Sequence, residues 1–335
     1  MNNVIFRVDG DTGKNAGLGH IYRTISIYRE LKKKYLKKNF LFLTKKNSLG
    51  KKIIKKETSE KIINYLEKNL AKTFKLFNSE KDIILIDTFG KQKILNIFLN
   101  KIKFKKIISF DNLNDNLNNT NIIFNSIIFF KKKLKNSKFT KVFQGLKYFV
   151  FSKKMRSINF KKLKKKKIYK IFISSGGADH KNFLIKVLKI LKNFDQLFVY
   201  VIIGKGVKKN NPINSIHNSK KIKLIKNSNN LRNYIKKCDI CITSGGIVMF
   251  ECILLSKPLI VYPTYNHQKQ AVNFFSKKKS IIYIKKISQL KKIFLKLEKK
   301  INYFNKISRK CSSLIDDKGL IRVKNKIIKF IDETN

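Results

Sequence analysis

Short apolar runs alternate with amphipathic segments along almost the whole chain, and this alternation constrains the fold more than any other feature. In the amphipathic segments apolar side chains recur every three or four residues, which is the period of a helix. Because each such helix connects two strands that run in the same direction, the pattern predicts a parallel α/β sheet. In the first half we expect strands at 3–8, 40–43, 83–86, 106–110 and 122–124, with helices at about 20–37, 60–70 and 91–101.

The same alternation restarts after a basic stretch at 153–169, which has little periodicity and is typical of a connection. A length of 335 residues is enough for two domains. We expect a first α/β domain at 1–152, a second at 170–320, and a cleft between them as the ligand site. A last helix at 321–335 has room to pack back on the first domain. In the second half we expect strands at 170–174, 198–203, 222–225, 240–243, 259–262 and 281–284, with helices at 182–192, 229–237, 247–256 and 267–277.

The chain carries 77 Lys and Arg against 20 Asp and Glu, a formal net charge of +57. Such a charge is typical of proteins that bind nucleic acid or anionic membranes. A compositional bias explains it better, because only seven of the basic residues are Arg, Lys is spread through nearly every segment, and uncharged Asn, Ile and Phe are abundant too. Arg is the residue that bases and phosphates favour. We therefore expect no specific nucleic-acid partner, but some attraction of anionic metabolites and weak association with anionic surfaces.

No apolar run reaches the roughly 18–20 residues of a membrane span. The N-terminal residues also lack the basic and apolar regions of a signal peptide. Four cysteines in a chain of this kind are expected to be buried, reduced thiols. We therefore expect a cytoplasmic protein. The cysteines are Cys238, Cys241, Cys252 and Cys311.

Glycine is scarce, and its positions are informative. Of 14 glycines, ten fall in four clusters, at 10–19, 176–177, 204–206 and 245–246. Clustered glycines mark turns with positive φ or places where a ligand approaches the backbone closely. These turns are therefore the candidate sites of chemistry.

The first cluster lies between the first strand and the first helix, and it ends in Gly17, Gly19 and His20. A glycine-rich loop before a helix offers free backbone N–H groups to an anion or a sugar. It is not a dinucleotide fingerprint, because Tyr22 stands where the third glycine belongs, nor a P-loop or a calcium loop. A helix N-terminus disfavours imidazolium, so we expect a neutral His20 that can accept a proton. Local capping or packing is the alternative.

Two further clusters follow strands of the second half. Gly176 and Gly177 form either a phosphate-binding turn or simply a tight turn between a strand and a helix. The sequence Ser244-Gly245-Gly246 would direct its amides at a phosphate from the start of a helix.

Glu251 lies within the apolar run IVMFECILL of that helix. A carboxylate in such a place must be paired or must face a solvated site. We interpret it as an acceptor for the hydroxyls of a ribose, with a nearby Lys or Arg partner as the alternative.

Polar side chains also follow other strands. The amides of Asn266, Gln268 and Gln270 suit sugar hydroxyls or pyrophosphate oxygens, or they cap the helix that follows. Asp87 and Asp111 end strands of the first half, at the edge of an open α/β sheet that faces a ligand. Capping of turns is the alternative for these two as well.

Metal binding is not expected. The four histidines, at 20, 180, 217 and 267, are not spaced as metal ligands, and the pair Cys238 and Cys241 lacks a second pair. No Ser-His-Asp signature is present. We therefore expect no bound metal or cofactor.

Taken in order, these motifs resemble the nucleotide-sugar hydrolases of pseudaminic acid biosynthesis. Those enzymes are UDP-2,4-diacetamido-2,4,6-trideoxy-β-L-altropyranose hydrolases, and they are related to the spore-coat polysaccharide protein G. The resemblance covers nearly the whole chain. Its motifs are RxD at 7–9, GxGHxxR at 17–23, IDTFG at 86–90, ISFDN at 108–112, SSGGAD at 174–179, TSGGIVMFE at 243–251, NHQKQ at 266–270 and DDKGLIR at 316–322.

The resemblance implies a MurG-like GT-B fold, with two Rossmann-like domains facing across a cleft and UDP held mainly by the second. It implies that water cleaves the anomeric C–O bond and releases UDP and a free sugar for nonulosonic acid biosynthesis, without a metal. His20 aligns with the catalytic histidine of the family. The implied substrate-binding residues are Arg7, Asp9, Gly17, Gly19, Arg23, Asp87, Asp111, Asn266, Gln268 and Gln270, and the implied UDP-binding residues are Gly176, Gly177, Ser244, Gly245, Gly246 and Glu251.

One departure concerns Phe89, where the family usually has a Tyr. If that hydroxyl positions substrate or water, this protein acts on a different sugar or turns over slowly. Two other functions stay open. A GT-B glycosyltransferase would pass the sugar to an acceptor, whereas a basic nucleic-acid-binding protein would bind duplex DNA tightly without competition from UDP.

Overall fold

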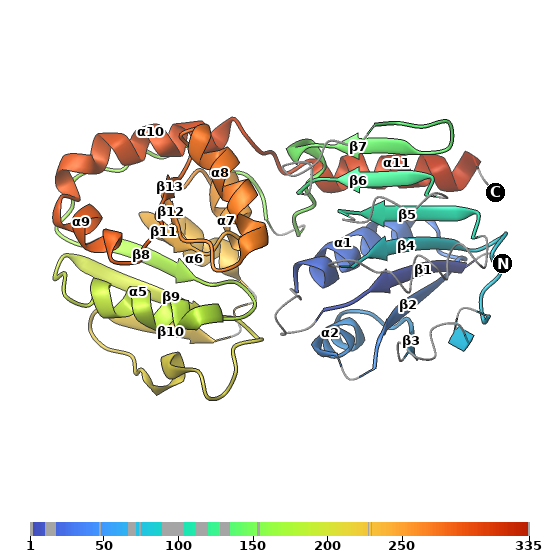
Figure 1. Ribbon diagram of the computed structural model, residues 1–335, viewed down its shortest axis with the longest axis horizontal. Coiled ribbons are helices and arrows are strands. Elements are labelled where there is room, and N and C mark those ends of the chain that lie inside the picture. Colours follow the sequence, from blue (N-terminus) through green and yellow to red (C-terminus); the bar gives the residue numbers. More distant parts are fainter. Residues whose placement is uncertain are drawn as a thin grey trace. The chain divides into compact units, whose positions relative to one another are not determined.

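The computed structural model describes residues 3–10, 18–46, 48–65, 72–73, 75–88, 104–111, 120–127, 135–152, 155–226, 228 and 230–333. The chain forms two compact units. The first comprises Met1–Lys153 and Lys318–Asn335, and the second comprises Lys154–Asp317. Each unit is built on a parallel β-sheet with helices, which confirms the α/β fold class (Figure 1).

The sheet of the first unit has the order β3-β2-β1-β4-β5-β6-β7 in the part of the chain that the structure describes, and its neighbouring strands are parallel. Strands β1 and β4 lie in its centre and are buried almost throughout, and most of their residues are apolar, as is usual for buried parallel strands. The strands are β1 Asn3–Val8, β2 Asn39–Lys45, β3 Lys61–Tyr65, β4 Ile83–Asp87, β5 Lys106–Phe110, β6 Ile122–Asn125 and β7 Lys141–Gln144.

The described helices of this unit include α1 Gly19–Lys34, α2 Leu49–Glu57 and α11 Gly319–Glu333. Helices α1 and α11 share one apolar core with the sheet, although almost 300 residues separate them in the sequence. Near the C-terminal end of each helix, Asp332 of α11 accepts hydrogen bonds from Lys34 and Tyr35 at the end of α1, at 2.7 and 2.5 Å. The C-terminal helix is therefore part of the first unit.

One expected helix is wrong. The sequence pattern predicts a helix at 60–70, but residues Lys61–Tyr65 form strand β3, which pairs with β2 from Leu41 to Lys45. This strand lies at the edge of the sheet, where partial exposure removes the continuous apolar run and tertiary pairing decides the structure. Helix α2 and strand β7 were not expected, and the expected helix at 91–101 lies outside the described residues.

The second unit has a sheet of order β10-β9-β8-β11-β12-β13, again with parallel neighbours. The expected strands and helices of this half are present, with bounds that shift by at most two residues. Its strands are β8 Tyr169–Ser174, β9 Leu197–Ile203, β10 Ile222–Lys226, β11 Ile240–Thr243, β12 Leu259–Val261 and β13 Ile282–Tyr283. Its α-helices are α5 Phe183–Leu191, α6 Leu231–Lys237, α7 Ile247–Leu254, α8 Lys269–Lys277, α9 Gln289–Leu295 and α10 Ile301–Ser312.

The basic segment at 155–168 lies along the second unit. Met155 and Leu163 are buried. The Leu163 N–H donates to the Asn305 side-chain oxygen at 2.7 Å, and the Asn305 side-chain NH₂ donates to the Leu163 carbonyl at 3.0 Å. The four cysteines are free thiols and buried, as expected. Among the described helices, none is long and apolar enough to cross a membrane.

Candidate active site

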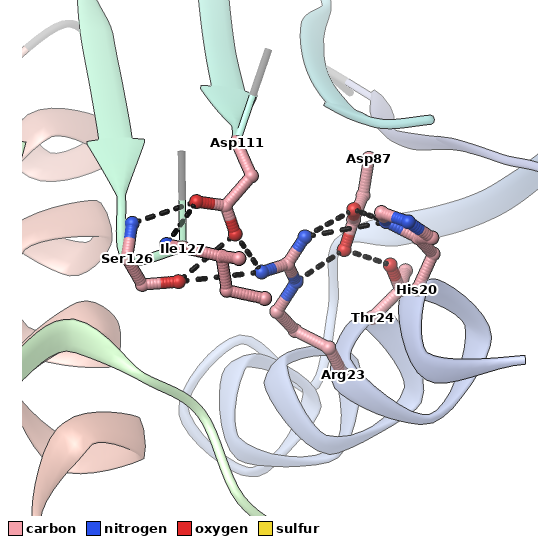
Figure 2. A network of polar contacts seen from close by, with 7 residues as sticks. All are labelled: His20, Arg23, Thr24, Asp87, Asp111, Ser126 and Ile127. Atoms are coloured by element: carbon pink, nitrogen blue, oxygen red, sulfur yellow. Dashed lines mark hydrogen bonds and ion pairs between the residues drawn. The ribbon is translucent and has the colours of Figure 1, made fainter. Parts of the chain in front are cut away.

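Polar side chains from separate segments meet at the carboxyl edge of the first sheet (Figure 2). Asp87 is the last residue of β4, Asp111 follows β5, and Ser126 follows β6. Helix α1 begins at this edge too and contributes His20 and Arg23. Because parallel strands end at the same edge, residues more than 100 positions apart in sequence become neighbours.

The central contact joins His20 to Asp87. Nδ1 of the imidazole lies 2.5 Å from Oδ1 of the carboxylate. The Asp87 side chain is 3% exposed, whereas that of His20 is 15% exposed, so of the two it is the imidazole that solvent or a ligand can reach. Asp87 therefore holds the ring from the protein side.

Arg23 lies one helical turn after His20 and bridges two carboxylates. Its Nε donates to Asp87 Oδ2 at 2.7 Å, and Nη2 donates to Asp87 Oδ1 at 2.6 Å, which makes a bidentate pair. Its Nη1 donates to Asp111. Thr24 adds a hydroxyl donor to Asp87 at 3.3 Å. Arg23 is 7% exposed, so its guanidinium is committed to these partners.

Asp111 is fixed by the chain that follows β6. Its Oδ1 accepts the backbone N–H groups of Ser126 and Ile127, each at 2.7 Å, and its Oδ2 accepts the Ser126 hydroxyl at 2.9 Å. The backbone of Asp111 has a positive φ of 43°, a conformation that non-glycine residues adopt only where the surroundings enforce it. Both carboxylate oxygens are thus engaged by the protein.

The charges in this network hold one another in the ionised form. Burial opposes the ionisation of Asp87, but the charge of Arg23 and the hydrogen bonds from Arg23 and His20 outweigh it and hold the pKa of Asp87 well below its ordinary value. Burial likewise opposes the charge of Arg23, and Asp87 and Asp111 outweigh it, so that the pKa of Arg23 is raised. Asp87 is consequently a carboxylate at any pH at which the protein works.

A second polar group lies on the neighbouring strands. The Arg7 side chain is 1% exposed and is paired with Asp9 at 2.8 Å, and it also donates to the Tyr65 hydroxyl. Tyr65 donates to Asp9 at 3.1 Å, and the Lys45 N–H donates to Asp9 at 3.0 Å. Nε and Nη1 of Arg7 are buried and have no hydrogen-bond partner within the described residues. The RxD motif is thus held together by a tyrosine that the sequence did not single out.

The start of α1 is placed by a close backbone approach. A Cβ on Gly10 would lie 2.4 Å from Ile21, the residue after His20. The Gly50 N–H at the start of α2 donates to the Gly10 carbonyl at 2.8 Å. Gly19 is the first residue of α1, and Gly17 lies outside the described residues. Gly10 therefore lets the turn that carries His20 pack tightly against the sheet edge.

The second unit gathers its own candidates at the carboxyl edge of its sheet. Gly176 follows β8 with a φ of +87°, which favours glycine. Ser244, which follows β11, donates its hydroxyl to the Ser175 carbonyl at 2.9 Å and is 2% exposed. Ser244 therefore joins the loop that includes Gly176 and Gly177 to the loop that begins α7, instead of standing free for a ligand.

The two glycines before α7 have different surroundings. A Cβ on Gly245 would lie 2.7 Å from Val272 and 2.9 Å from Gln268, so close packing against α8 explains this glycine. A Cβ on Gly246 would be 3.6 Å from the nearest side-chain atom, the Gln268 amide nitrogen, so the described protein leaves room there. Gly246 precedes the first turn of α7, which has no side-chain cap. Open N–H groups at this position suit an anion.

The amide residues of the NHQKQ motif divide into two kinds. Gln268 is buried, and its carbonyl oxygen accepts the N–H groups of Thr264 and Tyr265 at 2.9 and 3.2 Å. Asn266 and Gln270 are exposed. Gln268 therefore shapes the turn after β12, whereas the other two remain available to a ligand.

Glu251 lies in the second turn of α7. Its Oε2 atom is buried and has no hydrogen-bond partner among the described residues, and burial raises the pKa of Glu251 to about 8. Among the described residues, no Lys or Arg forms an ion pair with Glu251, which was the alternative interpretation. An unsatisfied buried carboxyl group is costly, and a ligand that donates hydrogen bonds would relieve the cost.

The structure therefore brings His20, Arg23, Asp87 and Asp111 into one network, and Arg7 and Asp9 into another. Ser126 and Tyr65 complete these networks and were not anticipated. Ser126 carries a signal similar to that of Asp111, because it directly follows a strand, although that strand ends in the polar Asn125. Tyr65 lay inside the wrongly expected helix. Within the described residues there is no group of three His, Cys, Asp or Glu side chains arranged to hold a metal.

Comparison with known sequences gives three matches. Residues 155–311 match the family model described as glycosyl transferases group 1. The chain is 30% identical over 295 residues to the uncharacterized protein MJ1062 of Methanocaldococcus jannaschii. This alignment covers 83% of this chain but only 60% of that relative's length. It is also 22% identical over 276 residues to the spore coat polysaccharide biosynthesis protein SpsG of Bacillus subtilis, covering 79% of each chain.

Comparison with solved structures identifies the fold. MurG of Acinetobacter baumannii superimposes with a TM-score of 0.67 at 10% identity, covering 98% of this chain and all of that one. Alr3699/HepE of Anabaena, solved in complex with UDP, gives 0.61 at 11% identity, covering 99% of this chain and all of that one. MnaA of S. aureus, also solved with UDP, gives 0.65 at 11% identity over 99% and 97%. The chain therefore has the GT-B fold of two Rossmann-like α/β domains.

Proposed function

We propose that this protein cleaves the bond between a diacetamido-trideoxy sugar and UDP, with water as the acceptor. The observation that carries the proposal is the 2.5 Å contact between Asp87 and the imidazole of His20 at the edge of the first sheet. A histidine whose one nitrogen is held by a buried carboxylate, and which is partly exposed, is the arrangement of a general base. The similarity to SpsG over 79% of the chain supports a role in polysaccharide biosynthesis.

In the proposed reaction His20 donates its Nδ1–H to Asp87, and Nε2 is the nitrogen that accepts a proton. Water loses a proton to Nε2 as its oxygen bonds to the anomeric carbon. The bond between that carbon and the diphosphate oxygen breaks, and UDP leaves with the electron pair. The imidazolium, stabilised by Asp87, then returns its proton to solvent.

The second unit would bind the UDP moiety. The open N–H groups at the start of α7 suit the diphosphate, and the space beside Gly246 allows a phosphate to approach the backbone. The same groups stabilise the negative charge that develops on the leaving UDP, so no metal is required for this step. Asn266 and Gln270 are exposed donors that suit phosphate or sugar oxygens.

Glu251 would accept hydrogen bonds from the ribose hydroxyls. Its buried oxygen lacks a partner among the described residues, and a vicinal diol supplies two donors. The loop that contains Gly176 and Gly177 would bind UDP from the adjacent strand. Arg7 and Asp9 remain candidates for contacts to the sugar.

A glycosyltransferase is the competing function, and the match of residues 155–311 to group 1 glycosyl transferases favours it. The two reactions differ only in whether water or a sugar hydroxyl receives the anomeric carbon. The test is to incubate the protein with UDP-diacetamido-trideoxy sugars without an acceptor and to measure free UDP. Stoichiometric UDP and free sugar support hydrolysis. UDP that forms only after an acceptor glycan is added, with the sugar attached to it, would establish transfer instead.

A further inference from the structure

The Asp87, Arg23 and Asp111 cluster contains one more carboxylate than the orientation of His20 requires. Asp87 alone could orient the imidazole, because it contacts Nδ1 directly. Yet Arg23 forms a bidentate pair with the same carboxylate and approaches His20 Nδ1 to 3.3 Å. A guanidinium in this position cancels much of the attraction that Asp87 exerts on a protonated imidazole.

We propose that Asp111 is a positioning residue that restores the negative charge behind His20 by neutralising Arg23, and thereby sets the strength of His20 as a base. With Asp111 ionised, the three buried groups carry a net charge of −1, and protonation of His20 brings the whole cluster to zero. Without the negative charge of Asp111, the charges of Asp87 and Arg23 sum to zero. Protonation of His20 would then leave a positive charge that no buried carboxylate compensates. The proposal deepens the proposed function and rests on it for its catalytic meaning.

The geometry gives Asp111 this role because it has no free capacity for substrate. Its oxygens accept Ser126 N, Ile127 N, the Ser126 hydroxyl and Arg23 (Figure 2). It is 6% exposed, and two of its hydrogen bonds come from backbone N–H groups that hold the carboxylate in place. A carboxylate built into a loop in this way serves the buried guanidinium beside it.

The charged groups that face His20 in the described part of the chain include Asp87 on β4 and Arg23 on its own helix. Asp111, at the end of β5, faces Arg23 from the far side. Figure 2 shows the row in order: Asp111, Arg23, Asp87 and His20. Because the protein interior screens charge weakly, removing the charge of Asp111 makes protonation of His20 less favourable even though the two residues are not in direct contact.

The test is the pH titration of His20 in the resting protein, followed by NMR of histidine labelled at Cε1 and assigned with the His20→Gln variant. Asp111→Asn should lower the midpoint of His20 by roughly one pH unit. Arg23→Gln, which removes the opposite charge, should raise it. This opposed pair keeps the test decisive if one variant does not fold.

Asp82→Asn is the matched control. Asp82 is also a buried carboxylate of the first unit, where it accepts the Asn3 N–H at 2.8 Å, but it precedes β4 and so lies at the opposite edge of the sheet. Its loss should leave the His20 midpoint unchanged. An unchanged midpoint in Asp111→Asn, or shifts of the same sign in both network variants, would overturn the proposal.

The titration needs no substrate, so its result stands apart from that of the proposed function. If UDP-sugar turnover is found as well, the acid limb of kcat/KM against pH should move to lower pH in Asp111→Asn by the same amount as the NMR midpoint. A merely structural loss would lower the rate at every pH without moving that limb.

Discussion

His20 Nδ1 and Asp87 Oδ1 lie 2.5 Å apart, although they come from the first turn of α1 and the last residue of β4. The pair exists because α1 starts at the edge of the sheet where β4 ends. It leaves the other nitrogen of the imidazole without this restraint, and the first prediction below tests that nitrogen as the proton acceptor.

Replacing His20 by Asn should lower turnover of a UDP-sugar by about 10²–10⁴-fold, the usual effect of losing a general base. UDP affinity should stay within about twofold, because the UDP-binding candidates belong to the second unit. Steady-state kinetics and calorimetric titration with UDP measure the two quantities. Turnover close to that of the wild type would remove His20 from the mechanism.

Asp87→Asn should destabilise the first unit most at neutral pH. The folded-state pKa of Asp87 is depressed, so this carboxylate contributes stability above its unfolded pKa of about 4, and the contribution is lost as the pH falls below that value. The gap in thermal stability between wild type and variant should therefore narrow from pH 7 to pH 2.5. Thermal unfolding at several pH values measures the gap, and a constant gap contradicts the role assigned to the carboxylate.

The affinity for uridine should rise with pH through Glu251. Burial raises the pKa of this carboxyl group to about 8. If ribose hydroxyls donate to the ionised form, binding releases a proton, so affinity should increase roughly 25-fold between pH 6.5 and 8.5 and then level off. Uridine avoids the titration of phosphate groups. Glu251→Gln should bind more weakly at high pH and show a flat profile; a wild-type profile in that variant would exclude Glu251 from the ribose site.

Gly245→Ala and Gly246→Ala should fail in different ways. The new Cβ at 245 would lie 2.7 Å from Val272, so this variant should lose stability through overpacking, by about 1–3 kcal/mol. The Cβ at 246 has room, so that variant should fold normally but bind UDP at least several-fold more weakly. Denaturant unfolding and UDP titration separate the two effects. Normal UDP affinity in Gly246→Ala would show that the phosphate does not approach there.

Much of the fold was accessible from the sequence because buried parallel strands such as β1 and β4 are short, mostly apolar segments. The edge strand β3 was predicted as a helix because its partly exposed residues at 61–65 have a pattern that a helix could also have. Only their pairing with β2 shows that they form a strand. Strand β7 was not predicted because it is only four residues long and partly exposed, so it lacks a buried apolar run.

The candidate site was predictable residue by residue but not as a network. His20, Asp87 and Asp111 could each be named from their places after strands or at a helix start, and Arg23 from the GxGHxxR motif of the resemblance. That Arg23 and Asp111 are buried and face one another depends on strand order, which the sequence does not reveal. Tyr65 needed the correct strand assignment before its place beside Arg7 could be known.

The central claim is that water attacks the anomeric carbon with His20 as the base. The most direct measurement is turnover of a UDP-diacetamido-trideoxy sugar in ¹⁸O-labelled water, with mass analysis of both products. The account predicts one ¹⁸O in the released sugar, none in UDP, and loss of this activity in His20→Asn. Label in the β-phosphate of UDP, or no release of UDP without an acceptor, would contradict it.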